Sequence, residues 1–204
     1  MFSISKPKIL GIVNITEDSF SDGGQFLDHQ AALSHAKKLV AEGADIIDVG
    51  GESTRPGANP VGADEEIKRV LPVIAGLVSQ VKVSVDTRHS EVARAAVDTG
   101  ATLINDVSAS LGELAGQLKV GWVAMHMQGD PRTMQKEPQY DDVVQEVRDY
   151  LVQRAEAAQA AGATVPFECS CRNSENILVR WRRCLISEIF SPNSDDTARR
   201  KRNS

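Results

Sequence analysis

Ile46-Ile-Asp-Val-Gly-Gly-Glu-Ser-Thr-Arg-Pro-Gly57 is a short apolar run that passes directly into a glycine-rich polar loop. The run Ile46 to Val49 is apolar on both faces, which is typical of a buried parallel strand. A helical pattern follows at about Ala63 to Val78, although Pro72 inside it is expected to kink or split the helix. A strand, a polar loop and a helix in this order predict one βα unit.

The same unit is expected five times along the chain. Besides Ile46 to Val49, strands are predicted at Ile9 to Val13, Val81 to Val85, Leu103 to Ile104 with its flanks, and Trp122 to Met125. The other helices are predicted at about Asp28 to Glu42, from an N-cap at Ser90 to Gly100, at Leu111 to Leu118, and at Asp141 to Ala161. Repeated right-handed units of this kind close into a barrel or open into a doubly wound sheet, and the pattern fits both.

The composition and net charge indicate which kind of binding partner the protein has. The 204 residues are 41% hydrophobic with a net charge of -5, so we expect one globular domain with a small-molecule ligand and no nucleic-acid partner. No apolar run reaches the roughly 18 residues of a membrane span, and Met1 to Lys8 lack a signal-peptide pattern. We therefore expect a cytoplasmic protein without a membrane partner.

A polar side chain follows each of the five expected strands. Ligands of barrels and open α/β sheets bind outside the carboxyl ends of the strands. One Asn or Asp there commonly caps a turn, but a polar group after every strand predicts a binding rim, formed by Asn14, Asp48, Asp86, Asn105 with Asp106, and His126. The remaining histidines, His29, His35 and His89, fall in or beside expected solvent-facing helix segments, and we assign them no function.

Two loops carry further candidates. Thr16 to Gly24 mixes small polar residues with Phe20, as expected of a mobile lid that covers an aromatic ligand. Gly50 to Gly57 combines glycine amides, hydroxyl groups and the Arg55 guanidinium, which suit an anion such as a phosphate.

Five segments together resemble the dihydropteroate synthase family over about residues 8 to 162, in order and in spacing. The resemblance implies a TIM barrel, here incomplete with about five βα units, in which a reduced pterin lies deep among the strand ends. The segments are Gly11-Ile-Val-Asn-Ile-Thr-Glu-Asp-Ser-Phe-Ser-Asp-Gly-Gly24, Asp48 to Gly57, Ser84-Val-Asp-Thr87, Ile104-Asn-Asp106 and Met125-His-Met-Gln-Gly129.

The resemblance also implies roles for single residues. Asp86 and Asn105 are expected to bind the pterin edge, and Asn14 to help hold Mg²⁺ and the diphosphate. The other substrate-binding positions it implies are Thr54 and Arg55 in the diphosphate and p-aminobenzoate loop, Phe20 and Pro56 near the aromatic amine, and Met125.

The implied function is that of a transferase in folate biosynthesis. Such an enzyme condenses 6-hydroxymethyl-7,8-dihydropterin diphosphate with p-aminobenzoate, giving 7,8-dihydropteroate and pyrophosphate. Loss of pyrophosphate leaves a pterin methylene cation that the neutral amine attacks, with Mg²⁺ and cationic side chains stabilising the leaving group. The intact family allows a homodimer, which we do not expect for this chain.

The chain departs from the family after Gly162. The family continues with Asp-Pro-Gly-x-Gly-Phe-Gly-Lys, Ser-Arg-Lys and Arg-x-His segments, whereas residues 167–204 hold all three cysteines and carry a charge of +3. We therefore divide the chain into a partial pterin-binding barrel at 1–166 and an unrelated basic tail at 167–204, expected to be disordered. A zinc-binding tail is disfavoured, because Cys169 and Cys171 have the wrong spacing for a common finger.

Three functional hypotheses follow. The first is the synthase, with impaired or absent turnover in this chain because the C-terminal segments are missing. The alternatives are a catalytically inactive remnant of that enzyme and a pterin-binding methyltransferase domain that shares the barrel. The loop at Thr16 to Gly24 and the sequence Ser53-Thr-Arg-Pro-Gly57 favour the synthase over the methyltransferase.

Overall fold

A computed structural model describes residues 8–15, 25–53, 60–128 and 139–162. In this part of the chain strands and helices alternate strictly. The strands are β1 (Leu10–Asn14), β2 (Ile46–Gly50), β3 (Lys82–Asp86), β4 (Leu103–Asp106) and β5 (Gly121–Ala124). The helices are α1 (Gln25–Ala41), α2 (Ala63–Leu77), α3 (Ser90–Thr99), α4 (Gly112–Leu118) and α5 (Val143–Ala160).

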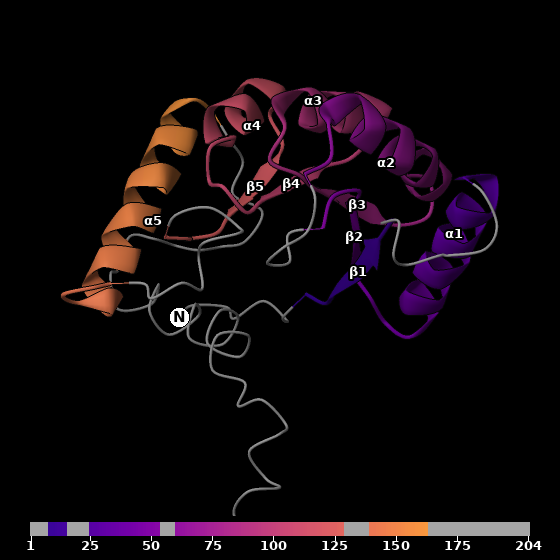
Figure 1. Ribbon diagram of the computed structural model, residues 1–204, viewed down its shortest axis with the longest axis horizontal. Helices are drawn as coiled ribbons and strands as arrows, with labels where there is room; N and C mark the ends of the chain where they lie inside the picture. The colour runs from indigo at the N-terminus through magenta and orange to yellow at the C-terminus, as the bar shows by residue number, and fades with distance from the viewer. Residues whose placement is uncertain (1–7, 16–24, 54–59, 129–138, 163–204) are drawn as a thin grey trace, which may run out of the picture.

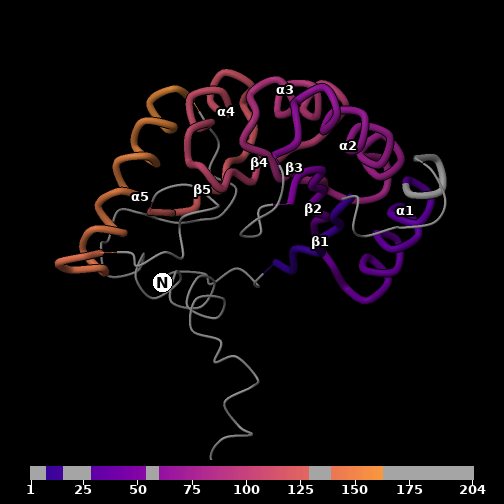
Figure 2. The backbone as a smooth tube through the Cα atoms, viewed as in Figure 1, coloured from indigo at the N-terminus to yellow at the C-terminus, as the bar shows by residue number. Residues whose placement is uncertain are grey.

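The five strands form one parallel sheet in the order β1-β2-β3-β4-β5. The helices follow one another in an arc along one side of this sheet, from α1 to α5, as the ribbon in Figure 1 and the backbone tube in Figure 2 show. A doubly wound sheet would reverse its strand order and carry helices on both faces. The described residues therefore form five consecutive units of a TIM barrel, as the resemblance implied.

The core lies between the sheet and the helices. In register across the strands, Val13, Val49, Val85, Ile104 and Trp122 are all buried. They meet the apolar faces of the helices, including Val70, Val73, Ile74 and Leu77 of α2. Because side chains alternate along a strand, this packing turns the intervening residues towards the other, concave side of the sheet.

The predicted strands are all present, with boundaries shifted by about one residue. The strand expected at Ile9 to Val13 is Leu10–Asn14, and the one expected at Val81 to Val85 is Lys82–Asp86. The polar residues Asn14 and Asp86 thus end their strands instead of following them. Ladder hydrogen bonds, which the apolar pattern does not report, determine these ends.

Two helix predictions need correction, because α2 is not split at Pro72 and Ser90 is not an N-cap. Helix α2 runs without a break through Pro72, which is exposed, because buried residues on both sides of the proline keep the helix packed on the sheet. The N-cap of α3 is His89, and Ser90 is the first helical residue. The Ser90 hydroxyl donates a hydrogen bond to Glu91 Oε2 at 3.0 Å instead of capping the helix. Gly100 ends α3 in the left-handed conformation, φ 118°, as expected.

The division into residues 1–166 and 167–204 stays a prediction, since residues 163–204 lie outside the described ranges. Among the described helices, none has both the length and the apolar character needed to cross a membrane.

Candidate functional site

Two rows of side chains on the concave side of the sheet form the candidate site. The deeper row places Ile12, Asp48, Ser84 and Leu103 in register, and the row at the carboxyl edge places Asn14, Gly50, Asp86 and Asn105 in register. Three strand-end residues of the predicted rim, Asn14, Asp86 and Asn105, therefore share one row.

Asp48 forms the polar floor of this site. It is 2% exposed and accepts a hydrogen bond from Asn105 Nδ2 at 2.9 Å on Oδ2. Its other oxygen, Oδ1, and the Ser84 hydroxyl make no close hydrogen bond within the described part of the chain, although Ser84 is near enough to lower the pKa of Asp48. Burial raises the pKa of Asp48, and the Ser84 and Asn105 side chains oppose that rise. Asp48 thus orients the Asn105 amide. Asp48 Oδ1 and the Ser84 hydroxyl lie in the row below the edge row.

Asp86 stands at the centre of the edge row. Burial, together with the neighbouring carboxyl groups, with Asp48 first among them, raises its pKa to about 7. Desolvation and like charges both disfavour the ionised carboxylate. At neutral pH Asp86 therefore exists in both protonation states and can accept or donate a hydrogen bond.

Gly50 leaves a gap between Asn14 and Asp86. A Cβ atom built on Gly50 would lie 3.1 Å from Asn14 Oδ1 and 3.6 Å from Asp86 Oδ2. Because no side chain fills this place, the amide oxygen and the carboxylate both face it. The gap is narrow, so Gly50 lets these two oxygen atoms approach each other across β2.

The structure does not describe every predicted residue. Phe20, Thr54, Arg55 and Pro56 lie outside the described ranges. Met125 directly follows β5 and is half-buried, and its backbone amide donates to the Asp106 carbonyl at 3.2 Å.

Asp106 and His126 do not join the rim, so the prediction that all strand-end polar groups converge was wrong for these two. Asp106 is fully buried and accepts hydrogen bonds from the Leu111 amide at 2.7 Å and from Trp122 Nε1 at 3.2 Å. The His126 ring lies edge-on to the ring of Tyr150 from α5, with the centroids 5.0 Å apart, and burial lowers its pKa. Strand alternation turns Asp106 towards the helices, and His126, which lies two residues beyond the end of β5, packs on Tyr150 of α5.

A bidentate ion pair holds the first part of the β2–α2 loop. Arg88 donates from Nε to Glu52 Oε2 at 2.9 Å and from Nη2 to Oε1 at 2.8 Å. Glu52 also accepts from the Val61 amide at 3.2 Å, and Arg69 Nη1 donates to the Gly51 carbonyl at 3.2 Å. A paired fork of this kind fixes orientation as well as charge. The segment that leads to Thr54 and Arg55 is therefore tied to β3 and to α2.

Three residues at this loop were missed by sequence reasoning as a group. Glu52, Glu66 and His89 bring one ligand atom each within 4.8 Å of one another, an arrangement that could hold a metal ion. His89 had been assigned no function because it lies next to a solvent-facing segment. A signal was present for Glu66, which occupies the buried face of α2 four residues before Val70.

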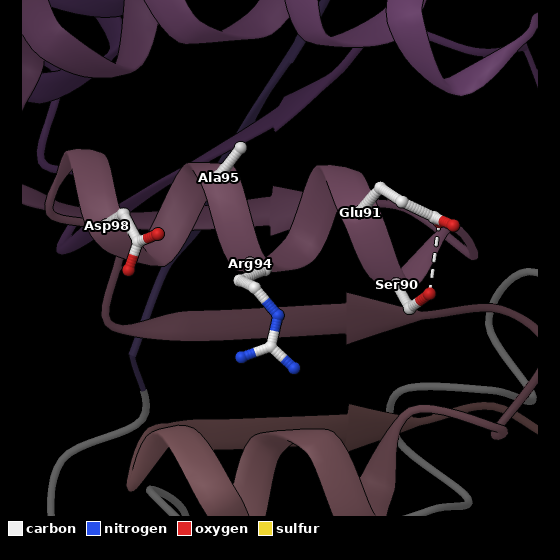
Figure 3. Close-up of a pocket in the computed structure, with 5 residues that line it drawn as sticks. All are labelled: Ser90, Glu91, Arg94, Ala95 and Asp98. Carbon is white, nitrogen blue, oxygen red and sulfur yellow. Dashed lines mark hydrogen bonds between the residues drawn. The ribbon is translucent and has the colours of Figure 1, made fainter.

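A shallow hollow of about 310 Å³ lies on the outer surface of α3 (Figure 3). Its lining residues, Ser90, Glu91, Arg94, Ala95 and Asp98, all belong to that one helix. Most of these residues are exposed. The hollow is separate from the concave face and from the three-residue group.

Comparisons with known proteins agree with this geometry. A family model described as pterin binding enzyme matches residues 10–165. The dihydropteroate synthases of Neisseria meningitidis serogroup B and Escherichia coli K12 are 50% and 45% identical to the chain over 167 and 166 residues, which is 78% of this chain in each case. The chain spans 59% and 58% of their lengths.

Solved structures give the same result. A Xanthomonas albilineans dihydropteroate synthase with 4-aminobenzoic acid superposes with a TM-score of 0.70 at 49% identity, covering 78% of this chain and 59% of that one. The same enzyme in complex with 7,8-dihydropteroate gives a TM-score of 0.66 at 44% identity, covering 80% and 59%. On the fold, the motifs and the extent of the family match, the chain belongs to the pterin-binding enzyme family.

Proposed function

We propose that this chain carries the pterin half of a dihydropteroate synthase site, which joins a pterin diphosphate to p-aminobenzoate. The observation that carries the proposal is the edge row, in which Asn14, Asp86 and Asn105 lie in register around the gap at Gly50. The relatives in the matched structures hold 4-aminobenzoic acid and 7,8-dihydropteroate. Because the chain spans 59% of the length of such a relative, we propose the activity and the substrates for it, and we do not expect a homodimer.

Asp86 and Asn105 would form hydrogen bonds with the edge of the pterin ring. A pterin presents adjacent N–H donors and ring acceptors along one edge. A carboxylate accepts two N–H bonds, while an amide donates and accepts. Asn105 already donates to Asp48 at 2.9 Å, so its amide orientation is set before a ligand binds. This arrangement supports an acceptor role for Asp86, with the Asn105 oxygen available to a ligand donor.

Mg²⁺ fits the edge row beside the pterin. Asn14 Oδ1 is an exposed oxygen donor next to the Gly50 gap, with Asp86 Oδ2 on the other side of it. Oxygen donors in an open position, completed by water and by substrate phosphates, are what Mg²⁺ takes. When bound, the ion would neutralise charge on the leaving diphosphate. We assign Asn14 as its protein contact.

Residues of the β1–α1 and β2–α2 loops, with Met125, would form the rest of the substrate site. Thr54 and Arg55 would bind the diphosphate or the aminobenzoate carboxylate, with Phe20 and Pro56 near the aromatic amine. Met125 would contribute apolar surface after β5. The Glu52–Arg88 pair supports the loop assignment, because it anchors the residues just before Thr54.

Calorimetry with 6-hydroxymethyl-7,8-dihydropterin diphosphate and Mg²⁺ tests the proposal. Asp86→Ala should weaken binding roughly ten- to a hundredfold, because a pterin N–H pair loses its acceptor at a cost of about 1 to 3 kcal/mol. Asp98→Ala, at an exposed position on α3, is the matched control. Equal affinity for the Asp86 variant and the control would remove Asp86 from the site.

A product assay with both substrates addresses turnover. The expectation that this chain turns over poorly stays a prediction, and so does its cytoplasmic location. Pterin binding without product formation would agree with that expectation, whereas turnover in the usual enzyme range of about 1 to 10³ per second would contradict it.

A further inference from the structure

Glu66 is a completely buried carboxyl group that lacks a close hydrogen bond, with the Thr87 hydroxyl and the His89 ring as more distant polar neighbours. Its side chain lies on the inward face of α2, 0% exposed, and neither carboxylate oxygen makes a hydrogen bond to any described residue. Buried polar side chains in native proteins are nearly always hydrogen-bonded, and an exception calls for an unseen ion or water. Glu66 is such an exception.

His89 presents a second unpaired atom to the same place. Its Nε2 is buried without a hydrogen-bond partner in the described ranges, 3.9 Å from Glu66 Oε2 and 3.5 Å from Glu52 Oε2. Both distances are too long for good hydrogen bonds. One nitrogen and two carboxylates, from three different segments, therefore surround a common point without bonding one another.

We propose that Glu52, Glu66 and His89 form a binding site for a divalent metal ion that accepts nitrogen ligands, such as Zn²⁺. Tetrahedral coordination with bonds of about 2.1 Å places neighbouring ligand atoms roughly 3.4 Å apart. The two distances of 3.5 and 3.9 Å need only small side-chain adjustments to reach this value. The imidazole nitrogen favours zinc over Mg²⁺, which prefers oxygen ligands, and a water would complete the coordination.

Arg88 is compatible with a metal on Glu52. Its guanidinium donates one hydrogen bond to each carboxylate oxygen, and each oxygen has a second lone pair. Carboxylates that bind metals are themselves commonly hydrogen-bonded by an outer partner, which orients them. When Glu52 and Glu66 are both ionised, their two negative charges and the positive charge of Arg88 sum to −1. A bound divalent cation would change this sum to +1.

A metal bound at this site would cross-link three segments of the fold. Glu52 opens the β2–α2 loop, Glu66 lies in the first part of α2, and His89 connects β3 to α3. Glu66 lies on the face of α2 that packs against the sheet, whereas the pterin row lies on the concave side of the sheet. The zinc proposal does not rest on the proposed enzymatic function.

Zinc titration of the full chain tests this proposal. Cys169, Cys171 and Cys184 are first replaced by serine in all samples, because thiolates bind zinc themselves, and excess Mg²⁺ is present throughout. Binding of Zn²⁺ without any pterin ligand is then measured by calorimetry in this Mg²⁺ buffer. The visible spectrum with Co²⁺ reports the coordination geometry. His89→Ala and Glu66→Gln remove one ligand each, while His35→Ala and Glu113→Gln, at exposed helix positions, are the matched controls.

One Zn²⁺ per chain is expected, with a raised thermal transition in its presence. His89→Ala and Glu66→Gln should weaken Zn²⁺ binding at least tenfold and abolish the four-coordinate Co²⁺ spectrum, and the controls should do neither. His89→Gln, which retains a polar side chain, replaces His89→Ala if the latter does not fold. Zn²⁺ affinity that is the same in the His89 variant and the His35 variant, or the absence of binding in the three-serine background, would overturn the proposal.

Discussion

Asp86 owes its chemistry to the groups around it. Burial and nearby carboxyl groups bring its pKa to about 7, so that a small change of pH alters its charge. Only the carboxylate accepts two N–H bonds from a pterin edge, since the protonated acid gives up one acceptor. The ligand and the proton therefore compete for the same oxygens.

This competition predicts a pH-dependent affinity. Binding of 6-hydroxymethyl-7,8-dihydropterin, which has no phosphate to titrate, should strengthen up to about tenfold between pH 6 and pH 8 as Asp86 ionises through its pKa of about 7. Calorimetry at a series of pH values measures this. Asp86→Asn cannot ionise and should give weaker, flat binding, so a parallel pH slope in that variant would place the titrating group elsewhere.

Glu66 links pH to stability. Burial raises its pKa from 4.5 to about 7, so the folded state holds a proton that the unfolded state releases at lower pH. Its stabilising contribution is complete below pH 4.5 and is lost as pH rises through about 7. The shift corresponds to roughly 3 kcal/mol.

Glu66→Gln should remove this share of the pH dependence. In EDTA, the free energy of unfolding of the original chain should fall relative to that of the variant between pH 5 and pH 8, by up to about 3 kcal/mol. Urea unfolding at each pH measures the difference. A constant difference across this range would mean that Glu66 does not hold the proton.

The residues of the edge row could be predicted, and the reason is geometric. A polar residue at the end of an apolar run reaches the carboxyl edge of any parallel sheet, which identified Asn14, Asp86 and Asn105. Direction across the sheet was harder, because a one-residue shift in a strand boundary reverses the side on which a residue lies. Asp106 was misplaced for this reason, whereas His126 lies beyond the end of β5.

At the scale of the elements, the backbone of α4 lies close to the end of α5 at Gly116. A Cβ atom on Gly116 of α4 would lie 2.5 Å from the carbonyl oxygen of Ala161, at the end of α5. Backbone atoms cannot move aside as a flexible side chain does. Gly116 therefore permits a helix contact that no larger residue allows.

Gly116→Ala should destabilise the protein by about 1 to 3 kcal/mol, because the added methyl group forces the two helices apart. Thermal unfolding measures the change. Gly62→Ala is the control, since a Cβ atom there meets nothing within 4 Å and its φ of -72° suits any residue. If both variants unfold at the same temperature, the α4–α5 contact is not rigid.

Helices and strands were predictable as elements because apolar periodicity and turn residues act locally. Gly100 was expected to end α3 and does so with φ 118°. The continuity of α2 through Pro72 could not be predicted in this way. It depends on tertiary packing of residues such as Val70 and Val73, which outweighs the local cost of proline.

At the scale of the whole molecule, the described core runs from Val13 to Ala158. A chain shortened to residues 1–166 should therefore keep a cooperative thermal transition within a few degrees of that of the full chain, as a self-contained core unfolds as a unit. Calorimetric scans of both chains make the comparison. A transition that broadens or disappears on shortening would show that residues 167–204 contribute to the fold.

The arrangement of the units could not be read from local pattern. A barrel and a doubly wound sheet use the same βα unit, and they differ in which strands become neighbours. Strand order and one-sided helix coverage settle this choice, and both are properties of the assembled sheet (Figure 1).

The sequential strand order also bears on how the chain acquires its structure during synthesis. Each strand pairs with the strand made just before it, at separations of 36 residues for Leu10 with Ile46 and 18 for Leu103 with Gly121. No pairing in the described sheet waits for a distant segment, so the loop-closure entropy of each step is small. A ribosome releases the chain in this same direction, and each new βα unit emerges beside a sheet edge that is already in place. Growth of the sheet can therefore keep pace with translation, one unit at a time.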